Sequence, residues 1–177
     1  IVDEAYAGDI IGVFDPGIFS IGDTICTPGK KFRFGGIPTF APEHFSRVSP
    51  RDSMKRKQFI KGTEQIAQEG AIQIFKLPNS GMEEVIVGVV GTLQFDVFQY
   101  RMKSEYGVDL RMEGLPYEHL RFIAKSPVED LKDLNLSSDV ELLEDYRGHS
   151  LLVFSSLWSI DYTIKRNPGL ELSETLN

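Results

Sequence analysis

Short apolar runs separated by turn sequences make up the chain up to about residue 45. Residues 8–14 and 21–25 each predict a short strand. Asp15-Pro16-Gly17 predicts a turn between them, because proline presets φ and glycine accepts a positive φ. Gly35-Gly36-Ile37-Pro38 and Ala41-Pro42 predict a stiff, extended connector. Two or three short strands cannot bury a core by themselves, so we interpret this segment as the end of a β-barrel.

From about residue 45 the pattern changes to alternating strands and helices. It predicts strands at 45–48, 71–75, 84–90 and 108–112, and helices at 53–69 and 92–106. Asp52 suits the N-cap of the first helix, Thr92 caps the second, and Gly70 and Gly107 suit the positions that follow them. Residues 85–90 are apolar without alternation, so we expect both faces of that strand to be covered. The order strand–helix–strand–strand–helix–strand is that of a ferredoxin-like unit.

The two predicted helices distribute their apolar residues differently. The first has one apolar face, and its opposite face carries Lys57, Lys61, Glu64 and Gln68. The second has two apolar stripes on opposite sides, one of Leu93, Val97 and Tyr100, the other of Phe95, Phe98, Met102 and Tyr106. Because one stripe packs on the sheet, we expect a further layer to bury the other.

Residues 116–177 are predicted to supply that layer. They contain a strand at 120–124, a short helix from Ser126-Pro127 to about 134, a hairpin of 140–146 and 150–154, and a helix from Ser155 or Ser156 to Arg166. The predicted fold class is α+β: C-terminal strands of a β-barrel, a ferredoxin-like βαββαβ unit and an additional C-terminal α/β layer. The predicted domains are 1–43, barrel end plus linker, and 44–177, with the ferredoxin-like core at 45–115 and the extension at 116–177.

Composition narrows the class of protein. The 177 residues are 41% hydrophobic and 25% charged, as in globular proteins. The sequence contains neither an apolar run of roughly 20 residues nor a signal-peptide pattern, so we expect no membrane association. A single cysteine, Cys26, indicates a reducing, cytoplasmic compartment. The chain begins at Ile1 without a methionine, so we expect it to be cut from a longer protein. We also expect the protein to be a monomer.

Charge is unevenly distributed along the chain. Between residues 30 and 61, nine basic residues stand against Glu43 and Asp52, which gives this stretch +7 while the whole chain carries −7. The stretch is either a solvated helix face or a positive surface that docks onto RNA. The candidate ribosome- or RNA-contacting residues are Lys30, Lys31, Arg33, Arg47, Arg51, Lys55, Arg56, Lys57 and Lys61.

Residue patterns for catalysis are weak, and we predict no catalytic, cofactor-binding or metal-binding residue in this chain. Gly29-Lys30 lacks the first glycine and the hydroxyl of a phosphate-binding loop. Asp145-Tyr146-Arg147-Gly148 matches the short Asp-x-x-Gly pattern of GTPase switches, but such tetrapeptides occur by chance, and we interpret it as a plain hairpin turn. None of the three histidines has a second metal ligand at helical spacing. Phe154, Trp158 and Tyr162 recur every four residues, as in a core stripe; stacking of bases on them requires exposure.

Three stretches resemble one family of bacterial translational GTPases. Gly91-Thr92-Leu93-Gln94-Phe95-Asp96-Val97, followed by Lys103-Ser104-Glu105-Tyr106, resembles peptide chain release factor three and, more distantly, the third domain of elongation factor G. Residues 5–12 with 21–24 resemble the closing strands of that family's second-domain barrel. Residues 40–73 resemble the entry into its third domain. The resemblance covers residues 1 to about 115; beyond that it rests on element order and length.

The resemblance implies a protein that uses GTP to help remove class one, stop-codon-reading release factors from the ribosome. GTP or GDP with magnesium would bind an N-terminal domain that this chain lacks, so no cofactor and no enzyme activity are expected here. The partners it implies are small-subunit rRNA and ribosomal proteins. Two alternatives remain: the third domain of another ribosomal GTPase, and a stand-alone ferredoxin-like regulatory or ligand-binding module.

Overall fold

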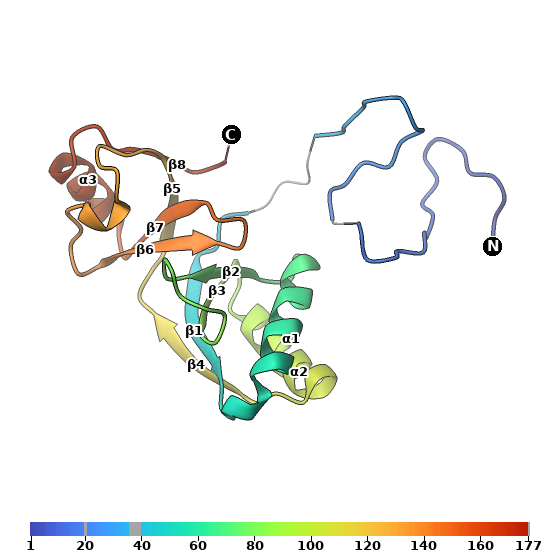
Figure 1. Cartoon of the computed structure of the whole chain (residues 1–177), viewed down its shortest axis with the longest axis horizontal. Coiled ribbons are helices and arrows are strands. Elements are labelled where there is room, and N and C mark those ends of the chain that lie inside the picture. The colour runs from blue at the N-terminus through green and yellow to red at the C-terminus, as the bar shows by residue number, and fades with distance from the viewer. Residues whose placement is uncertain (20, 36–39, 177) are drawn as a thin grey trace. The chain divides into compact units, whose positions relative to one another are not determined.

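The computed structural model describes residues 1–19, 21–35 and 40–176 (Figure 1). It divides the chain into two compact units, Ile1–Ile37 and Pro38–Asn177.

The first unit has turns but, over residues 1–19 and 21–35, neither helix nor strand. The predicted turn is present: Asp15 Oδ1 accepts hydrogen bonds from the amides of Gly17 at 2.8 Å and Ile18 at 3.0 Å. The strands predicted at 8–14 and 21–25 are wrong. A strand needs a neighbour to complete its hydrogen bonds, and the described part of this unit contains none, so Ile10 and Phe14 stay exposed. The predicted connector at Gly35–Pro38 falls largely outside the described residues.

The second unit is α+β and contains one open antiparallel sheet. Its strands are β1 (His44–Pro50), β2 (Gln73–Lys76), β3 (Val85–Val89), β4 (Leu110–Leu115), β5 (His119–Lys125), β6 (Val140–Asp145), β7 (Ser150–Phe154) and β8 (Glu171–Ser173). Its helices are α1 (Arg56–Gln68), α2 (Leu93–Tyr106) and α3 (Leu157–Arg166), with short 3₁₀ turns η1 (Ser53–Lys55) and η2 (Leu131–Asp133). The strand order is β4-β1-β3-β2-β6-β7-β5-β8. Only two residue pairs, Phe75↔Asp145 and Lys76↔Glu144, join β2 to β6.

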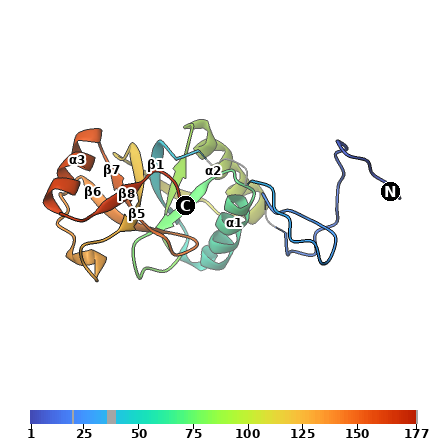
Figure 2. The same ribbon diagram turned by 90° about the horizontal axis from the view of Figure 1, so that it is seen from above.

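Both faces of the β1–β4 part of the sheet are covered. Helices α1 and α2 lie together on one face (Figures 1 and 2), where Phe59, Ile66, Phe98 and Met102 pack against Val85, Val87 and Val89 of β3. Ile86 points to the other face because side chains alternate along a strand. All five residues of β3 are buried, which confirms the prediction from its continuous apolar sequence.

The extension covers the sheet face opposite the helices and leaves one stripe of α2 exposed. Phe45 and Ile86 pack there in one buried cluster with Leu120, Leu143, Leu151 and Val153. A third cluster lies between β6, β7 and α3 and includes Leu152, Phe154 and Ile160. The prediction that both stripes of α2 are buried, one of them by a further layer, is therefore wrong: Phe98 and Met102 are buried, but Leu93, Val97 and Tyr100 are 76%, 53% and 72% exposed. The physical reason is that β6 pairs with the edge of β2 and carries the extension to the far side of the sheet.

Most helix ends lie where the sequence predicts them. Asp52 caps the first helical turn by accepting from the Met54 amide at 2.9 Å, and Gly70 and Gly107 have positive φ. Ser156 caps α3 in a capping box with Ser159. These caps satisfy backbone groups that would otherwise lack partners.

Two local predictions differ from the structure, and one strand was not predicted. Thr92 precedes α2 but makes no side-chain cap; instead Gln94 Oε1 accepts from the amides of Val90 at 2.9 Å and Gly91 at 3.0 Å. The helix predicted from Ser126 is wrong, because the Ser126 hydroxyl closes a local turn with Val128 and only η2 becomes helical. Strand β8 was not predicted, since three residues leave little pattern.

The predicted hairpin around Arg147-Gly148 is confirmed as β6–β7. The buried Asp145 carboxylate accepts from the amides of Arg147 at 2.9 Å and His149 at 2.8 Å, and it lies 2.8 Å from His149 Nδ1. These contacts account for the Asp-x-x-Gly sequence as turn-forming residues.

Candidate nucleic-acid interface

The structure separates the nine candidate basic residues into groups with different surroundings. Lys30, Lys31 and Arg33 are exposed and belong to the first unit. The other six belong to the second unit, on β1 and around the start of α1. The run of positive charge in the sequence is therefore not one cluster within either unit.

Arg47 and Arg51 are engaged in contacts within the fold. Arg47 lies between two carboxylates, with Nε 3.6 Å from Glu84 and Nη1 3.8 Å from Glu113. Arg51 Nε donates to the Leu110 carbonyl at 3.0 Å. The carboxylates offset the charge of Arg47, and the Leu110 carbonyl occupies one donor of Arg51, so both guanidinium groups are less available to a partner.

The first turns of α1 present the remaining cations. Arg56 forms an ion pair with Glu83. Lys57 and Lys61 are exposed one turn apart, and within the described part of the chain neither forms an ion pair. Lys55 precedes them at the end of η1. We call Lys55, Lys57 and Lys61 the α1 basic cluster.

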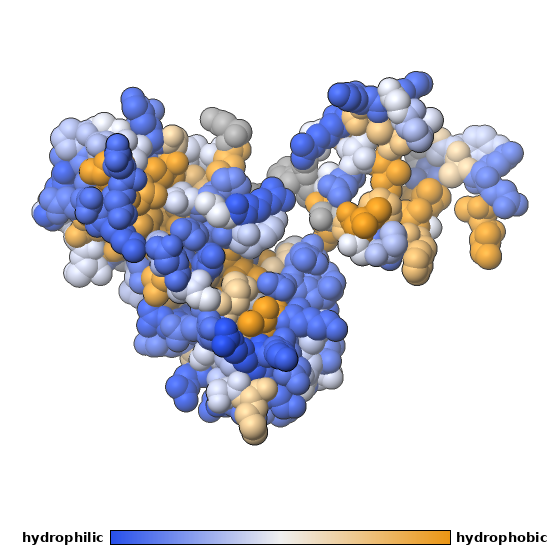
Figure 3. Space-filling view, in the orientation of Figure 1, coloured by the Kyte–Doolittle hydropathy of each residue, from blue (hydrophilic) through white to orange (hydrophobic). Residues whose placement is uncertain are grey.

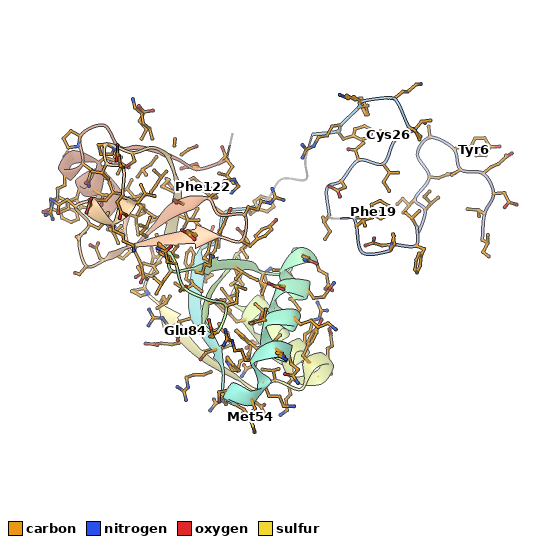
Figure 4. All side chains as sticks on the ribbon, in the orientation of Figure 1. Tyr6, Phe19, Cys26, Met54, Glu84 and Phe122 are labelled. Atoms are coloured by element: carbon orange, nitrogen blue, oxygen red, sulfur yellow. The ribbon has the colours of Figure 1, made fainter. Side chains whose placement is uncertain are left out.

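The local sequence explains why this face points outward. Phe59, Gly62, Thr63 and Ile66 bury the opposite side of α1, as the helical periodicity predicts. Met54, at the beginning of the helical segment, projects away from the protein body (Figure 4) and is 85% exposed. The face seen in Figure 3 is largely hydrophilic along α1. Glu64 shares the exposed face, so the cluster is positive but not uniformly so.

The position of α1 is fixed by close packing against α2. A Cβ on Gly62 would lie 2.7 Å from Cγ of Tyr106 and 2.8 Å from Sδ of Met102, so only glycine permits this approach. Arg101 of α2 bonds to Glu69, just after α1, at 2.5 Å and to Glu105 at 2.7 Å. Hydrogen bonds from Arg101 lower the pKa of both carboxyl groups, and bonds to Glu105 and Glu69 raise the pKa of the guanidinium.

Other shifted pKa values have local structural causes. The Ser137 hydroxyl donates to Asp139 at 2.6 Å and is the main reason that the pKa of Asp139 is lowered. Burial, and then a 2.9 Å hydrogen bond to Glu141, raise the pKa of Tyr117 to about 12. Both groups bond to neighbours within the fold, so neither shift indicates acid–base chemistry.

Sequence reasoning missed two exposed apolar surfaces. One is the α2 stripe described above. The other is the outer face of α3, with Leu157 62% and Trp158 67% exposed. The helical periodicity separated the two stripes of α2 but did not indicate which of them would be buried. For α3, the four-residue spacing of Trp158 and Tyr162 was the signal in the sequence that both lie on one side of the helix.

The described residues contain no group of three or more His, Cys, Asp or Glu that could hold a metal ion. Cys26 is exposed, with Sγ 3.0 Å from the Lys30 carbonyl oxygen. A pocket of about 280 Å³ lies beside α1 and contains the Lys76–Glu144 ion pair.

Among the described helices, none has the length and apolar character to cross a membrane.

Comparison with known proteins gives consistent results. Residues 34–164 match the family described as class II release factor RF3, C-terminal domain. The chain is 49% identical over 170 residues to peptide chain release factor 3 of Symbiobacterium thermophilum, covering 96% of this chain and 32% of that protein. It is 42% identical over 173 residues to the protein of that name from Gloeobacter violaceus (98% and 32%), and 41% over 175 residues to that of Listeria welshimeri (99% and 33%). The chain thus spans about a third of the length of the curated relatives it matches.

Proposed function

Because this chain belongs to the family of class II release factor RF3 C-terminal domains, we propose that it docks onto the ribosome and contacts small-subunit rRNA through the α1 basic cluster. One observation supports this surface above the others. Lys57 and Lys61 are exposed on successive turns of a helix that packs closely against α2, and no carboxylate of the described residues forms an ion pair with them. Such a pair is available to phosphate groups, whose contacts dominate affinity for nucleic acid.

The wider proposal concerns the longer protein of which this chain would be a part. We propose that this longer protein acts in translation termination as a GTPase that promotes release of class one release factors from the ribosome. GTP or GDP and magnesium would bind outside this chain. Family membership favours this role over that of another ribosomal GTPase or a stand-alone module. Ribosomal proteins as well as rRNA are proposed partners, and the protein is proposed to be a cytoplasmic monomer.

The domain assignment belongs to the same proposal. Residues 1–43 are the end of a second-domain barrel plus linker, and residues 44–177 are the third domain. In the third domain, 45–115 form a ferredoxin-like core and 116–177 an extension. The order of β1, α1, β2, β3, α2 and β4 supports the core. The exposed apolar side chains of the first unit, such as Ile10 and Phe14, support a segment completed by strands from elsewhere in the protein.

The other candidate residues have secondary roles in this proposal. Lys30, Lys31 and Arg33 form a second possible contact with rRNA, because they are exposed. Arg47, Arg51 and Arg56 already bond within the fold, and a phosphate would have to compete with those partners.

Reversing two charges of the α1 basic cluster tests the docking surface. The double change Lys57→Glu and Lys61→Glu is expected to weaken binding of the full chain to purified ribosomes. It should also make the slope of log affinity against log salt concentration shallower by about two units. Each lysine–phosphate contact that is lost means that fewer counterions are released from the RNA on binding. Thermal stability should change little, because both side chains are exposed. Sedimentation binding across a salt series measures both quantities.

The matched control is Lys125→Glu with Lys132→Glu. It makes the same change in net charge, and both lysines are exposed, Lys125 at the end of β5, where it pairs with Glu171 at 3.3 Å, and Lys132 in η2. We expect it to change affinity less and to keep the parent slope. Identical affinity and slope in the parent and the α1 double variant would contradict the proposal and direct the search to Lys30, Lys31 and Arg33.

A further inference from the structure

Two aromatic residues and an arginine form a stack along α3, in which Trp158 and Arg166 are exposed and Tyr162 is half-buried. The Trp158 and Tyr162 rings are parallel within 14°, with centroids 4.8 Å apart. One turn later, the Arg166 guanidinium carbon lies 5.3 Å from the Tyr162 centroid. Tyr162 therefore has a planar neighbour one turn before it and one turn after it. Trp158 stands at the end of the row and is 67% exposed.

The stack is not needed to build the core. Ile160 and Thr163 bury the opposite side of α3, and Phe154, which shares the spacing of the aromatic residues, is buried in β7. Tryptophan is highly buried on average in folded proteins. An exposed tryptophan held in position by a second ring is thus arranged to receive a flat ligand.

Charge and shape indicate what the ligand is. Lys165 and Arg166 occupy the last turn of α3 beside the rings, and Asp161 is the one acidic residue of this helix. Hot spots of protein interfaces are also rich in Trp, Tyr and Arg, but they lie in fully desolvated pockets, whereas Trp158 is 67% exposed and charged side chains share the outward face with the rings. Unpaired bases stack on aromatic rings and guanidinium planes while neighbouring cations contact the phosphates.

We propose that α3 binds single-stranded RNA by stacking one unpaired base on Trp158, with Lys165 and Arg166, about two helical turns further along α3, contacting phosphates of neighbouring nucleotides. The site lies on a different helix from the α1 basic cluster and uses none of the nine candidate basic residues. It rests on the ring geometry and exposure of α3, so it stands or falls separately from the docking proposal.

The chain has a single tryptophan, which makes its fluorescence a direct probe of the site. Titration of the full chain with an adenosine RNA decamer should quench the emission of Trp158 saturably. A decamer of the same length with abasic riboses keeps the phosphates but has nothing to stack. We expect it to bind at least about five-fold more weakly and to leave the emission unchanged. The Lys57→Glu, Lys61→Glu variant should retain the quenching.

Variants separate stacking from general affinity. Measured by anisotropy of a labelled adenosine decamer, Trp158→Ala should raise the Kd about 5- to 100-fold, and Trp158→Phe should recover part of the loss. Leu157→Ala changes an equally exposed neighbour outside the stack and should bind as the parent does. Equal binding of the abasic and base-bearing decamers, or an unchanged Kd for Trp158→Ala, would overturn the proposal. Full RNA affinity of Trp158→Ala with loss of binding to RNA-free ribosomal proteins would also overturn it, assigning the stack to a protein partner.

Discussion

Replacing Phe98 with alanine is expected to lower the free energy of unfolding by about 3–5 kcal/mol. The ring is 1% exposed and lies in the cluster between α2, α1 and β3. Its loss removes buried apolar area and leaves a cavity that rigid neighbours fill incompletely. Chemical denaturation of parent and variant measures the difference.

The neighbouring Val97 provides the control. It belongs to the other stripe of α2 and is 53% exposed, so Val97→Ala should change stability by no more than about 0.5 kcal/mol. Similar losses for both variants would mean that both stripes are covered in solution, contrary to the structure.

The second large effect is expected at Gly88, in the middle of β3. A Cβ there would lie 2.8 Å from Cβ of Pro42 and 2.9 Å from Cε2 of Phe75. Gly88→Ala should therefore destabilise the protein by about 1–3 kcal/mol, as overpacking of a filled core does. The melting temperature and the denaturation midpoint should both fall.

Gly114, in β4, is the matched strand glycine, because a Cβ there would meet nothing within 4 Å. Gly114→Ala should leave stability within about 0.5 kcal/mol of the parent. If the two alanine variants were equally stable, Pro42 and Phe75 would not be packed on Gly88 as the structure has them.

Elements governed by short-range chemistry were predictable from the sequence. Asp52, Gly70, Gly107 and Ser156 mark helix ends because caps and left-handed turns act on residues within one turn of themselves. Ser126-Pro127 shows the limit of such reasoning, since its hydroxyl bonds inside a turn and the expected helix does not form.

Packing between distant segments was not predictable. Both stripes of α2 are apolar, and which one is buried depends on where residues 119–173 fold. The extension joins the sheet through two residue pairs between β2 and β6 and packs on Phe45 and Ile86, and neither strand shows in its own sequence which edge it will join. The extension therefore lies across the sheet from the position that the helical wheel predicted.

The candidate interface could be predicted only in part, because contacts between distant segments also decide which cations are unpaired. The sequence shows nine cations, but their acidic partners are far along the chain: Glu113 for Arg47 and Glu83 for Arg56. Only the i, i+4 relation of Lys57 and Lys61 on a polar helix face was readable locally. On α3, the same spacing wrongly grouped the buried Phe154 with Trp158, because the helix begins after Phe154.

The central claim is that the outer face of α1 contacts rRNA, and photo-crosslinking from that face tests it most directly. A benzophenone side chain is placed at position 57 of the full chain, and at position 125 as the control, and each protein is irradiated while bound to ribosomes. The account predicts crosslinks from position 57 to small-subunit rRNA, abolished by excess unlabelled chain, and few or none from position 125. A chain that sediments with ribosomes yet forms no RNA crosslink from position 57 would contradict it.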